Sequence, residues 1–128
     1  MKMIITRTAT ISMDDNCIIH IVIHKNVHID YEDSIDNFLV VKTLTSNMPS
    51  SKLIDGTSPG WTISKQAINY IMNEDAHGKT IARALIFGDY TARLLATINF
   101  FIKSTKTPVK VFSQSDKAIK WLLNFSKE

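Results

Sequence analysis

The hydrophobic pattern switches from the period of a strand to that of a helix near residue 88. Residues 81–87, IARALIF, form an apolar run interrupted only by Arg83, as in a strand buried on both faces. Gly88 and Asp89 end that run. Apolar residues then recur at the three-and-four spacing of one helix face, at Leu94, Leu95, Ile98, Phe101 and Ile102. The segment predicts a central strand that leads directly into a helix capped by Asp89, as in a mostly parallel α/β sheet.

The N-terminal segment has a different pattern. Residues 4–13 alternate loosely between apolar and polar, which predicts one strand with a solvent-exposed face. Asp14, Asp15 and Asn16 are typical turn residues, and residues 17–24, CIIHIVIH, predict the returning strand. The chain therefore begins with an antiparallel hairpin.

Two helices are predicted between this hairpin and the central strand. The first covers residues 31–45, with Asp30 as its cap and an apolar stripe at Ile35, Phe38 and Leu39. A short strand at 52–55 and the turn-rich sequence DGTSPG follow. The second helix covers residues 64–78, and its predicted buried residues are Ala67, Ile68 and Ile71.

The C-terminal segment predicts one further strand and one further helix. The strand covers residues 109–112, and Ser113 with Asp116 resembles a capping box at the start of the helix. The apolar stripe of that helix is Ala118, Trp121, Leu122 and Phe125. The predicted order is ββαβαβαβα, a mostly parallel sheet with one antiparallel edge hairpin and four helices.

Composition indicates one soluble domain over residues 1–128. The hydrophobic share of 45% and the charged share of 21% are typical of a globular protein and exclude a disordered one. No apolar run approaches the roughly 18 residues that span a bilayer, and the N-terminus lacks a signal-peptide segment. We therefore expect a cytoplasmic protein. The only cysteine, Cys17, lies in an apolar strand pattern, which predicts a buried and unreactive thiol.

Charge is distributed unevenly along the chain. Residues 1–78 carry 6 Lys and Arg against 9 Asp and Glu, whereas residues 79–128 carry 9 against 3. The basic residues of the second part fall on the polar sides of predicted helices, and no basic run is interleaved with exposed aromatic residues. We therefore expect no nucleic-acid binding.

Three histidines, His20, His24 and His28, are spaced four residues apart. On a strand this spacing separates them by about 13 Å, whereas a metal lies about 2 Å from each ring nitrogen that binds it. We therefore interpret them as polar side chains on a half-exposed face. No metal or other cofactor is expected.

Polar residues follow the predicted parallel strands at their carboxyl ends, where open α/β sheets bind ligands. They are Asp55, Asp89 and Ser113, and they could bind a cation or accept a phosphoryl group. The alternative is that they only cap helices and close turns. The chain contains no phosphate loop, nucleophile elbow or paired-histidine motif, and so no catalytic residue is proposed.

Two aromatic residues are candidate contacts for a partner or a ligand. Phe100 lies off the apolar stripe of its predicted helix, beside Arg93 and Thr97. It is either covered by a neighbouring helix or free to contact a partner. Trp61, in a predicted loop, leaves the same two possibilities open.

The predicted order of strands and helices, together with the sequence of residues 82–122, resembles a known family. The segment reads ARALIFGDYTARLLATINFFIKSTKTPVKVFSQSDKAIKWL and resembles the C-terminal half of uncharacterised small bacterial proteins described as SpoIIAA-like or STAS/Sec14-like. Over the first half the resemblance is one of topology. It implies the SpoIIAA-like (STAS) sandwich fold and a bacterial source, but a fold does not determine a function.

The resemblance also implies a place for phosphorylation. In regulatory STAS proteins a serine at the start of the second helix, in an Asp-Ser-Ser-Gly motif, is phosphorylated and switches partner binding. Here Asp55 is followed by glycine, so that the motif itself is absent. Thr57 and Ser58 are the nearest positional matches, and Ser64 is the best helix cap. These three are candidate phospho-acceptors.

Three functional hypotheses follow. The first is a non-enzymatic SpoIIAA-like regulatory or protein-interaction domain that forms a homodimer through exposed apolar helix surface. The alternative, implied by the Sec14-like label, is the binding of a small apolar ligand or lipid between the second and third helices. A third is a metal-dependent or phosphoryl-transfer enzyme, which requires Asp55 and Asp89 within about 5 Å of each other.

Overall fold

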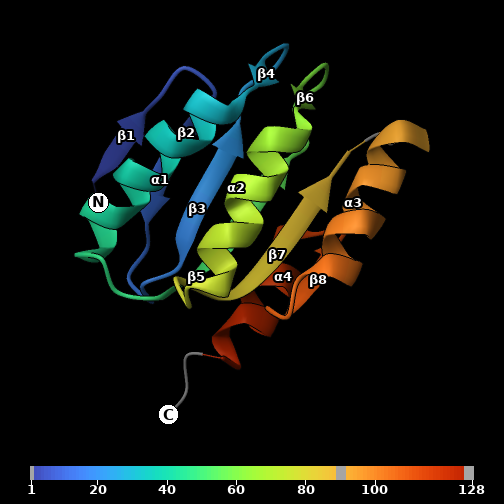
Figure 1. The fold of residues 1–128 in the computed structure, drawn as a ribbon. Helices are drawn as coiled ribbons and strands as arrows, with labels where there is room; N and C mark the ends of the chain where they lie inside the picture. The colour runs from blue at the N-terminus through green and yellow to red at the C-terminus, as the bar shows by residue number, and fades with distance from the viewer. Residues whose placement is uncertain (1, 89–91, 126–128) are drawn as a thin grey trace.

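The computed structural model describes residues 2–88 and 92–125, with the backbone alone at 92–95. Within this range a six-stranded sheet is covered by helices on both faces (Figure 1). The elements are β1 (Met3–Ile5), β2 (Ala9–Met13), β3 (Ile19–Ile23), β4 (His28–Ile29), α1 (Tyr31–Thr45), β5 (Ser50–Gly56), β6 (Thr62–Ile63), α2 (Lys65–Ala76), β7 (Thr80–Phe87), α3 (Ala92–Ser104), β8 (Val109–Phe112) and α4 (Ser115–Leu123).

The strands of the main sheet lie in the order β1-β2-β3-β5-β7-β8. The pairs β1–β2 and β2–β3 are antiparallel, whereas β3, β5, β7 and β8 pair in parallel. A second, two-stranded parallel sheet joins β4 to β6. The predicted architecture, a mostly parallel sheet with an antiparallel edge, is confirmed. The apolar run that begins at Ile81 is indeed an interior strand, since β7 lies between β5 and β8.

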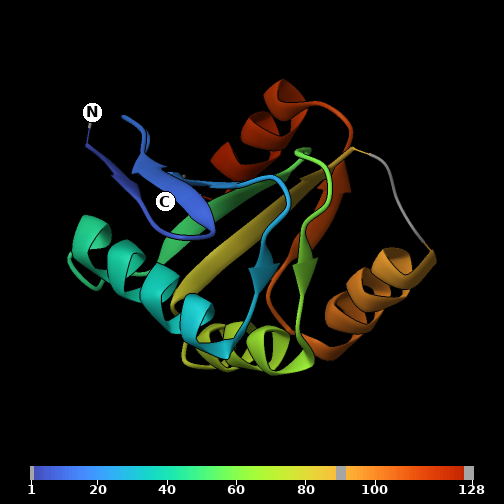
Figure 2. The same ribbon diagram turned by 90° about the horizontal axis from the view of Figure 1, so that it is seen from above.

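The two faces of the sheet carry different numbers of helices. Helices α1, α2 and α3 cover one face, and α4 covers the other (Figures 1 and 2). Alternate residues of β7 serve the two sides: Ala84 and Ile86 belong to the core formed with α4, whereas Leu85 and Phe87 pack with Ile98 of α3. Because both faces of β7 are buried, its residues are almost all apolar and do not alternate with polar ones.

The first predicted strand, residues 4–13, is wrong in one respect, because it divides into β1 and β2. The Thr6 hydroxyl oxygen accepts from the backbone N–H groups of Thr8 and Ala9, at 3.3 and 3.1 Å. The Thr6 N–H donates to the Ala9 carbonyl at 2.8 Å. These bonds form a local turn, and β1 folds back along β2 with Ile4 opposite Ile11.

The prediction of a buried thiol at Cys17 is also wrong, since this residue is exposed. Strand β3 begins only at Ile19, and Cys17 belongs to the turn before it. Its backbone is left-handed, with φ 63°, and its N–H donates to the Asp14 carbonyl at 3.0 Å. The turn before β3 therefore includes Cys17, one residue more than the apolar pattern indicates.

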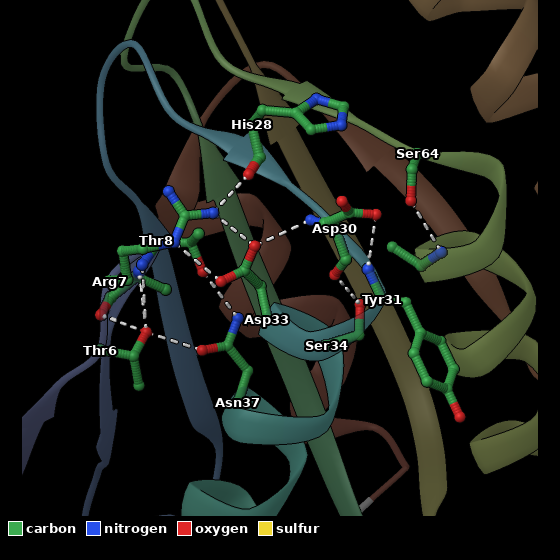
Figure 3. A network of polar contacts seen from close by, with 12 residues as sticks. Thr6, Arg7, Thr8, His28, Asp30, Tyr31, Asp33, Ser34, Asn37 and Ser64 are labelled. Atoms are coloured by element: carbon green, nitrogen blue, oxygen red, sulfur yellow. Dashed lines mark hydrogen bonds and ion pairs between the residues drawn. The ribbon is translucent and has the colours of Figure 1, made fainter.

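Helix α1 has the predicted bounds but not the predicted buried stripe. Leu39 is 51% exposed, while Asp33 and Val41 are buried. The face turned to the sheet includes Asp33, Asn37 and Val41, each four residues after the last, which lie on one side of a helix. Polar residues occupy that face because the 6–8 turn supplies them with hydrogen-bond partners, such as the Thr8 hydroxyl at 3.0 Å from the Asn37 amide nitrogen (Figure 3).

The predicted cap of the last helix is wrong as well. Helix α4 begins at Ser115, and its N-cap is Gln114, which makes no side-chain capping bond. Ser113 lies one residue before that cap and is exposed. The Gln114 carbonyl accepts from the Ala118 N–H at 3.3 Å, and the helix starts one residue later than a cap at Ser113 predicts. The apolar stripe of α4 is confirmed, with Ala118 and Leu122 fully buried.

Candidate functional site

A cavity of about 140 Å³ lies between the sheet and the three helices that cover one of its faces. Its walls are mostly apolar and come from six strands of the two sheets and from α1, α2 and α3. Five of the apolar wall residues are Ile23, Ile54, Ile68, Leu85 and Ile98. An engineered apolar cavity of about 150 Å³ binds benzene in another protein. The present cavity therefore has room for a molecule built on a single ring.

Trp61 forms part of the cavity wall and is held there by two contacts. Its ring stacks on Phe87 with centroids 5.8 Å apart, and its indole N–H donates to the Gly56 carbonyl at 3.0 Å. A Cβ at Gly56 would lie 2.7 Å from the Phe87 ring and 2.8 Å from the Trp61 ring. Glycine at this position lets both rings lie directly against the β5 backbone.

At one end of the cavity two cations of the sheet lie side by side. Lys52 of β5 pairs in register with Arg83 of β7, and both residues line the cavity. The last turn of α2 supplies one carboxylate to each. Glu74 bonds to the Lys52 ammonium, and Asp75 accepts from Arg83 Nη2 at 2.7 Å. We call these four residues the charged cluster.

Threonine hydroxyls complete the charged cluster. The Thr80 hydroxyl accepts from Lys52 Nζ at 2.7 Å and from Arg83 Nη2 at 3.2 Å. The Thr105 hydroxyl donates to Asp75 Oδ2 at 3.3 Å. Buried ionic groups need such partners, because an unpaired charge away from water costs several kcal/mol, on the order of 3–5.

The side chains of the charged cluster are almost fully buried. Lys52 is 1% exposed and Arg83 3%. Burial lowers the pKa of the Lys52 ammonium below its usual value, the Arg83 charge adds to this effect, and Asp75 opposes it. The Phe101 ring covers the guanidinium carbon of Arg83 at 5.8 Å. Arg83 Nε is buried and has no hydrogen-bond partner among the residues that the structure describes.

The residues predicted at the carboxyl ends of the strands do not form a site in the part of the chain that the structure describes. Asp55 accepts from the N–H and hydroxyl of Thr57, at 3.0 and 2.6 Å, and closes a local turn. Ser113 is exposed before α4. Asp89 lies outside the described residues, so its separation from Asp55 stays a prediction.

The three candidate phospho-acceptors lie in the segment that connects β5 to α2. Ser64 is the N-cap of this helix, and its hydroxyl accepts from the Ala67 N–H at 3.1 Å. Thr57 is exposed and bonded to Asp55, and Ser58 is partly exposed. Their phosphorylation stays a prediction.

Each of the three spaced histidines has a separate partner. His20 contacts Asp14 at 2.8 Å, His24 contacts the Thr10 hydroxyl at 2.9 Å, and His28 contacts the Thr62 hydroxyl at 2.7 Å. Over residues 2–88 and 96–125, no group of three or more His, Cys, Asp or Glu side chains could hold a metal ion.

A second polar network joins the 6–8 turn to the first turn of α1 (Figure 3). Arg7 Nε donates to Asp33 Oδ1 at 3.0 Å, and Arg7 Nη2 donates to the His28 carbonyl at 2.7 Å. Asp33 Oδ2 also accepts from the Asp30 N–H at 2.9 Å, as part of a capping box. These bonds hold the edge of the sheet against α1, and we interpret the network as structural.

Phe100 is 50% exposed on α3. No neighbouring helix covers it fully, so it is available to contact a partner. Trp61, by contrast, is turned inward to the cavity wall. The sequence left both aromatic residues as either covered or free to contact a partner. In the structure Phe100 is half exposed, whereas Trp61 lines the cavity.

The charged cluster was missed by the sequence analysis, which identified Arg83 only as an interruption of an apolar run. A cation in a strand buried on both faces was itself a signal, since it requires a buried counter-charge. Glu74 and Asp75, just before this strand, were the nearest candidates. The part played by Lys52 depends on strand register, which the sequence does not reveal.

Comparison with known proteins places the chain in a family and a fold. A family model described as a domain of unknown function, DUF7793, matches residues 11–126. A search of the curated proteins finds no match. Among solved structures, an uncharacterised protein of the DUF3478 family from Shewanella loihica PV-4, described as having a SpoIIAA-like fold, is similar with a TM-score of 0.57.

The structural similarity covers most of both proteins. It includes 89% of this chain and 91% of the Shewanella chain, at 18% sequence identity. The predicted SpoIIAA-like fold is therefore confirmed, and at this identity the similarity extends to the fold alone. No helix in the described part of the chain is long and apolar enough to cross a membrane.

Proposed function

The chain belongs to the DUF7793 family, whose function is unknown, and from the geometry of its interior we propose that it is a non-enzymatic domain that binds a small apolar molecule. The ligand lies in the cavity between the sheet and helices α1, α2 and α3. The cavity itself is the observation that carries the proposal. A concave and mostly apolar cavity with a few convergent polar groups is the usual form of a small-molecule site, and this cavity of about 140 Å³ has that form.

The chemistry of the walls favours an apolar ligand over bound water. Water in a buried site needs two to four polar partners, and the apolar part of this cavity provides none. A hydrocarbon ring placed there would contact Ile54, Ile68 and Ile98 from two sides. Binding would then be favoured by apolar surface removed from water.

A second candidate function is supported by Phe100. An aromatic ring half exposed on α3 is suited to a protein contact, including contact with a second copy of the chain. This is the regulatory or protein-interaction function that the SpoIIAA-like resemblance implies. The homodimer, the cytoplasmic location and the bacterial source stay predictions from the sequence.

Toluene is a suitable probe for the proposed cavity, and thermal unfolding is the measurement. Ligand at ten times its Kd stabilises a protein by about 1.4 kcal/mol, and for a chain of this size we expect Tm to rise by about 3 °C or more. Ile68→Phe, which places extra atoms in the cavity, should abolish the rise.

The matched control is Ile119→Phe on α4, which makes the same change on the other side of the sheet. This variant should keep the response of the unaltered protein. Equal responses in all three proteins, or no response in any, would refute the proposed function.

A further inference from the structure

We propose that the ligand of the cavity is an uncharged molecule about the size of one aromatic ring, and that it carries a single hydrogen-bond acceptor, which bonds to the Nε–H of Arg83. This inference rests on the proposed function. It adds the size, the charge and the polar contact of the ligand.

The size follows from the cavity volume. An engineered apolar cavity of about 150 Å³ in another protein holds benzene. A cavity of about 140 Å³ therefore has room for one ring or a short chain. The Sec14-like resemblance implied a lipid, and we infer a much smaller ligand instead.

The absence of ligand charge follows from the charged cluster. Lys52 and Arg83 supply at most two positive charges, and Glu74 and Asp75 balance them. The cluster thus has no net positive charge to offer an anion, although it holds two basic residues. A charged ligand would bring an additional, unpaired charge to a buried site, which is strongly unfavourable.

The polar contact follows from one unsatisfied donor. The side-chain polar atoms that are buried without a partner in residues 2–88 and 96–125 are Ser50 Oγ, Ser51 Oγ and Arg83 Nε. Of these three residues, Arg83 is the one that lines the cavity. Asp75 and Thr80 hold its Nη2 in place, so that the donor is positioned in advance. An acceptor oxygen within about 3 Å of Nε would satisfy it.

Four probes with the same ring test the charge of the ligand: toluene, benzyl alcohol, benzoate and benzylammonium. Their Kd values can be measured at neutral pH by NMR titration of ¹⁵N-labelled protein. We expect benzoate and benzylammonium to bind at least tenfold more weakly than benzyl alcohol. Benzoate binding as tightly as benzyl alcohol would overturn the inference and point to an anionic ligand.

Arg83→Lys tests the polar contact, because lysine keeps a positive charge but has no Nε–H. The ratio of the Kd for toluene to the Kd for benzyl alcohol should fall by about 3- to 10-fold in this variant, the range expected for one hydrogen bond. An unchanged ratio would overturn the inference while leaving the proposed function intact. If no probe binds the unaltered protein, the proposed function fails with it.

The unaltered protein supplies a second readout if Arg83→Lys does not fold. The Nε–H group of a buried arginine gives its own NMR cross-peak. Saturating benzyl alcohol should shift the Arg83 peak, whereas saturating toluene should shift it much less. Equal shifts with the two probes would contradict a hydrogen bond to Nε.

Discussion

Lys52 and Arg83 are neighbours in the sheet, with aligned Cα positions on adjacent parallel strands. Like charges at such positions repel each other, and burial strengthens this repulsion because it lowers the effective dielectric constant. Glu74 and Asp75 are consecutive residues at the end of α2, and each bonds to one of the two cations. The sheet therefore tolerates this pair of cations only while α2 remains docked on it.

The variant Asp75→Asn tests this dependence at the scale of one residue. It removes the charge that faces Arg83, and we expect it to lower the free energy of unfolding by about 3–5 kcal/mol, as for other broken buried ion pairs. Urea unfolding at neutral pH measures the effect.

The matched control is Asp116→Asn in the first turn of α4, where the side chain is exposed. It should change the stability by less than about 1 kcal/mol. If the two variants lost the same amount, Asp75 would not stabilise the buried cation.

A second residue-scale prediction concerns Gly56. Gly56→Ala forces the Phe87 and Trp61 rings off the β5 backbone, and we expect a loss of about 1–3 kcal/mol. The tryptophan emission of the protein should shift, because the Trp61 ring moves and its bond to the Gly56 carbonyl weakens. Thr57→Ala at the exposed neighbour is the control, and an equal effect there would argue against ring crowding as the cause.

At the scale of single elements, α1 has a polar face turned to the sheet. Asp33 and Asn37 lie there because the 6–8 turn provides partners for them. The hydrogen bond from Arg7 is the largest cause that lowers the pKa of Asp33 below its usual value. A carboxyl group with a lowered pKa stabilises the folded state above its unfolded-state pKa, near 4, and this contribution is lost as the pH falls through the folded-state value.

The variant Asp33→Asn should therefore show a pH-dependent loss. At pH 7 we expect it to be less stable than the unaltered protein by about 1–2 kcal/mol, as for one charged hydrogen bond together with one helix cap. The difference should shrink as the pH falls from about 4 toward 2. Urea unfolding at several pH values measures it, and a loss that stayed constant across that window would contradict the ion pair as its source.

Most of the elements could be predicted from the sequence, and the exceptions have physical reasons. The strand at 81–87 and the strand at 109–112 are defined by local apolar runs, and their helices by local spacing. The pair β4–β6 has two residues in each strand and joins His28 to Thr62. No local pattern specifies so short a strand, because its stability comes from a partner 34 residues away.

The buried face of α1 could not be predicted for a related reason. Apolar spacing favoured Leu39, whereas the structure buries Asp33 and Val41. The burial of polar residues can be predicted only when their partners are known, and here the partners come from the turn between β1 and β2. The exposed Cys17 was missed because its turn extends one residue into an apolar sequence.

At the scale of the whole molecule, three helices share one face of the sheet and one helix covers the other (Figure 2). Three helices that converge on a sheet must meet each other as well as the strands, and the cavity lies where they converge. The sequence predicted a pocket between the second and third helices through a family resemblance. Only the structure shows that the pocket extends beneath α1 and ends at the charged cluster.

The exposed Phe100 leads to a prediction about assembly. We expect light scattering with size exclusion to give a mass of twice the 14.5 kDa of the chain. Phe100→Glu should return the mass to that of one chain, because a charge replaces the apolar contact. A single-chain mass for the unaltered protein would contradict the predicted homodimer.

The central claim is that an apolar molecule binds in the cavity between the sheet and α1, α2 and α3. Isotope-filtered NMR of ¹³C-labelled protein with unlabelled toluene tests it most directly, because nuclear Overhauser effects report which methyl groups the ligand contacts. The account predicts effects to the methyl groups of Ile68, Leu85 and Ile98, and none to Ile119 or Leu122 on the opposite side of the sheet. Contacts confined to the α4 side, or contacts to exposed methyl groups alone, would contradict it.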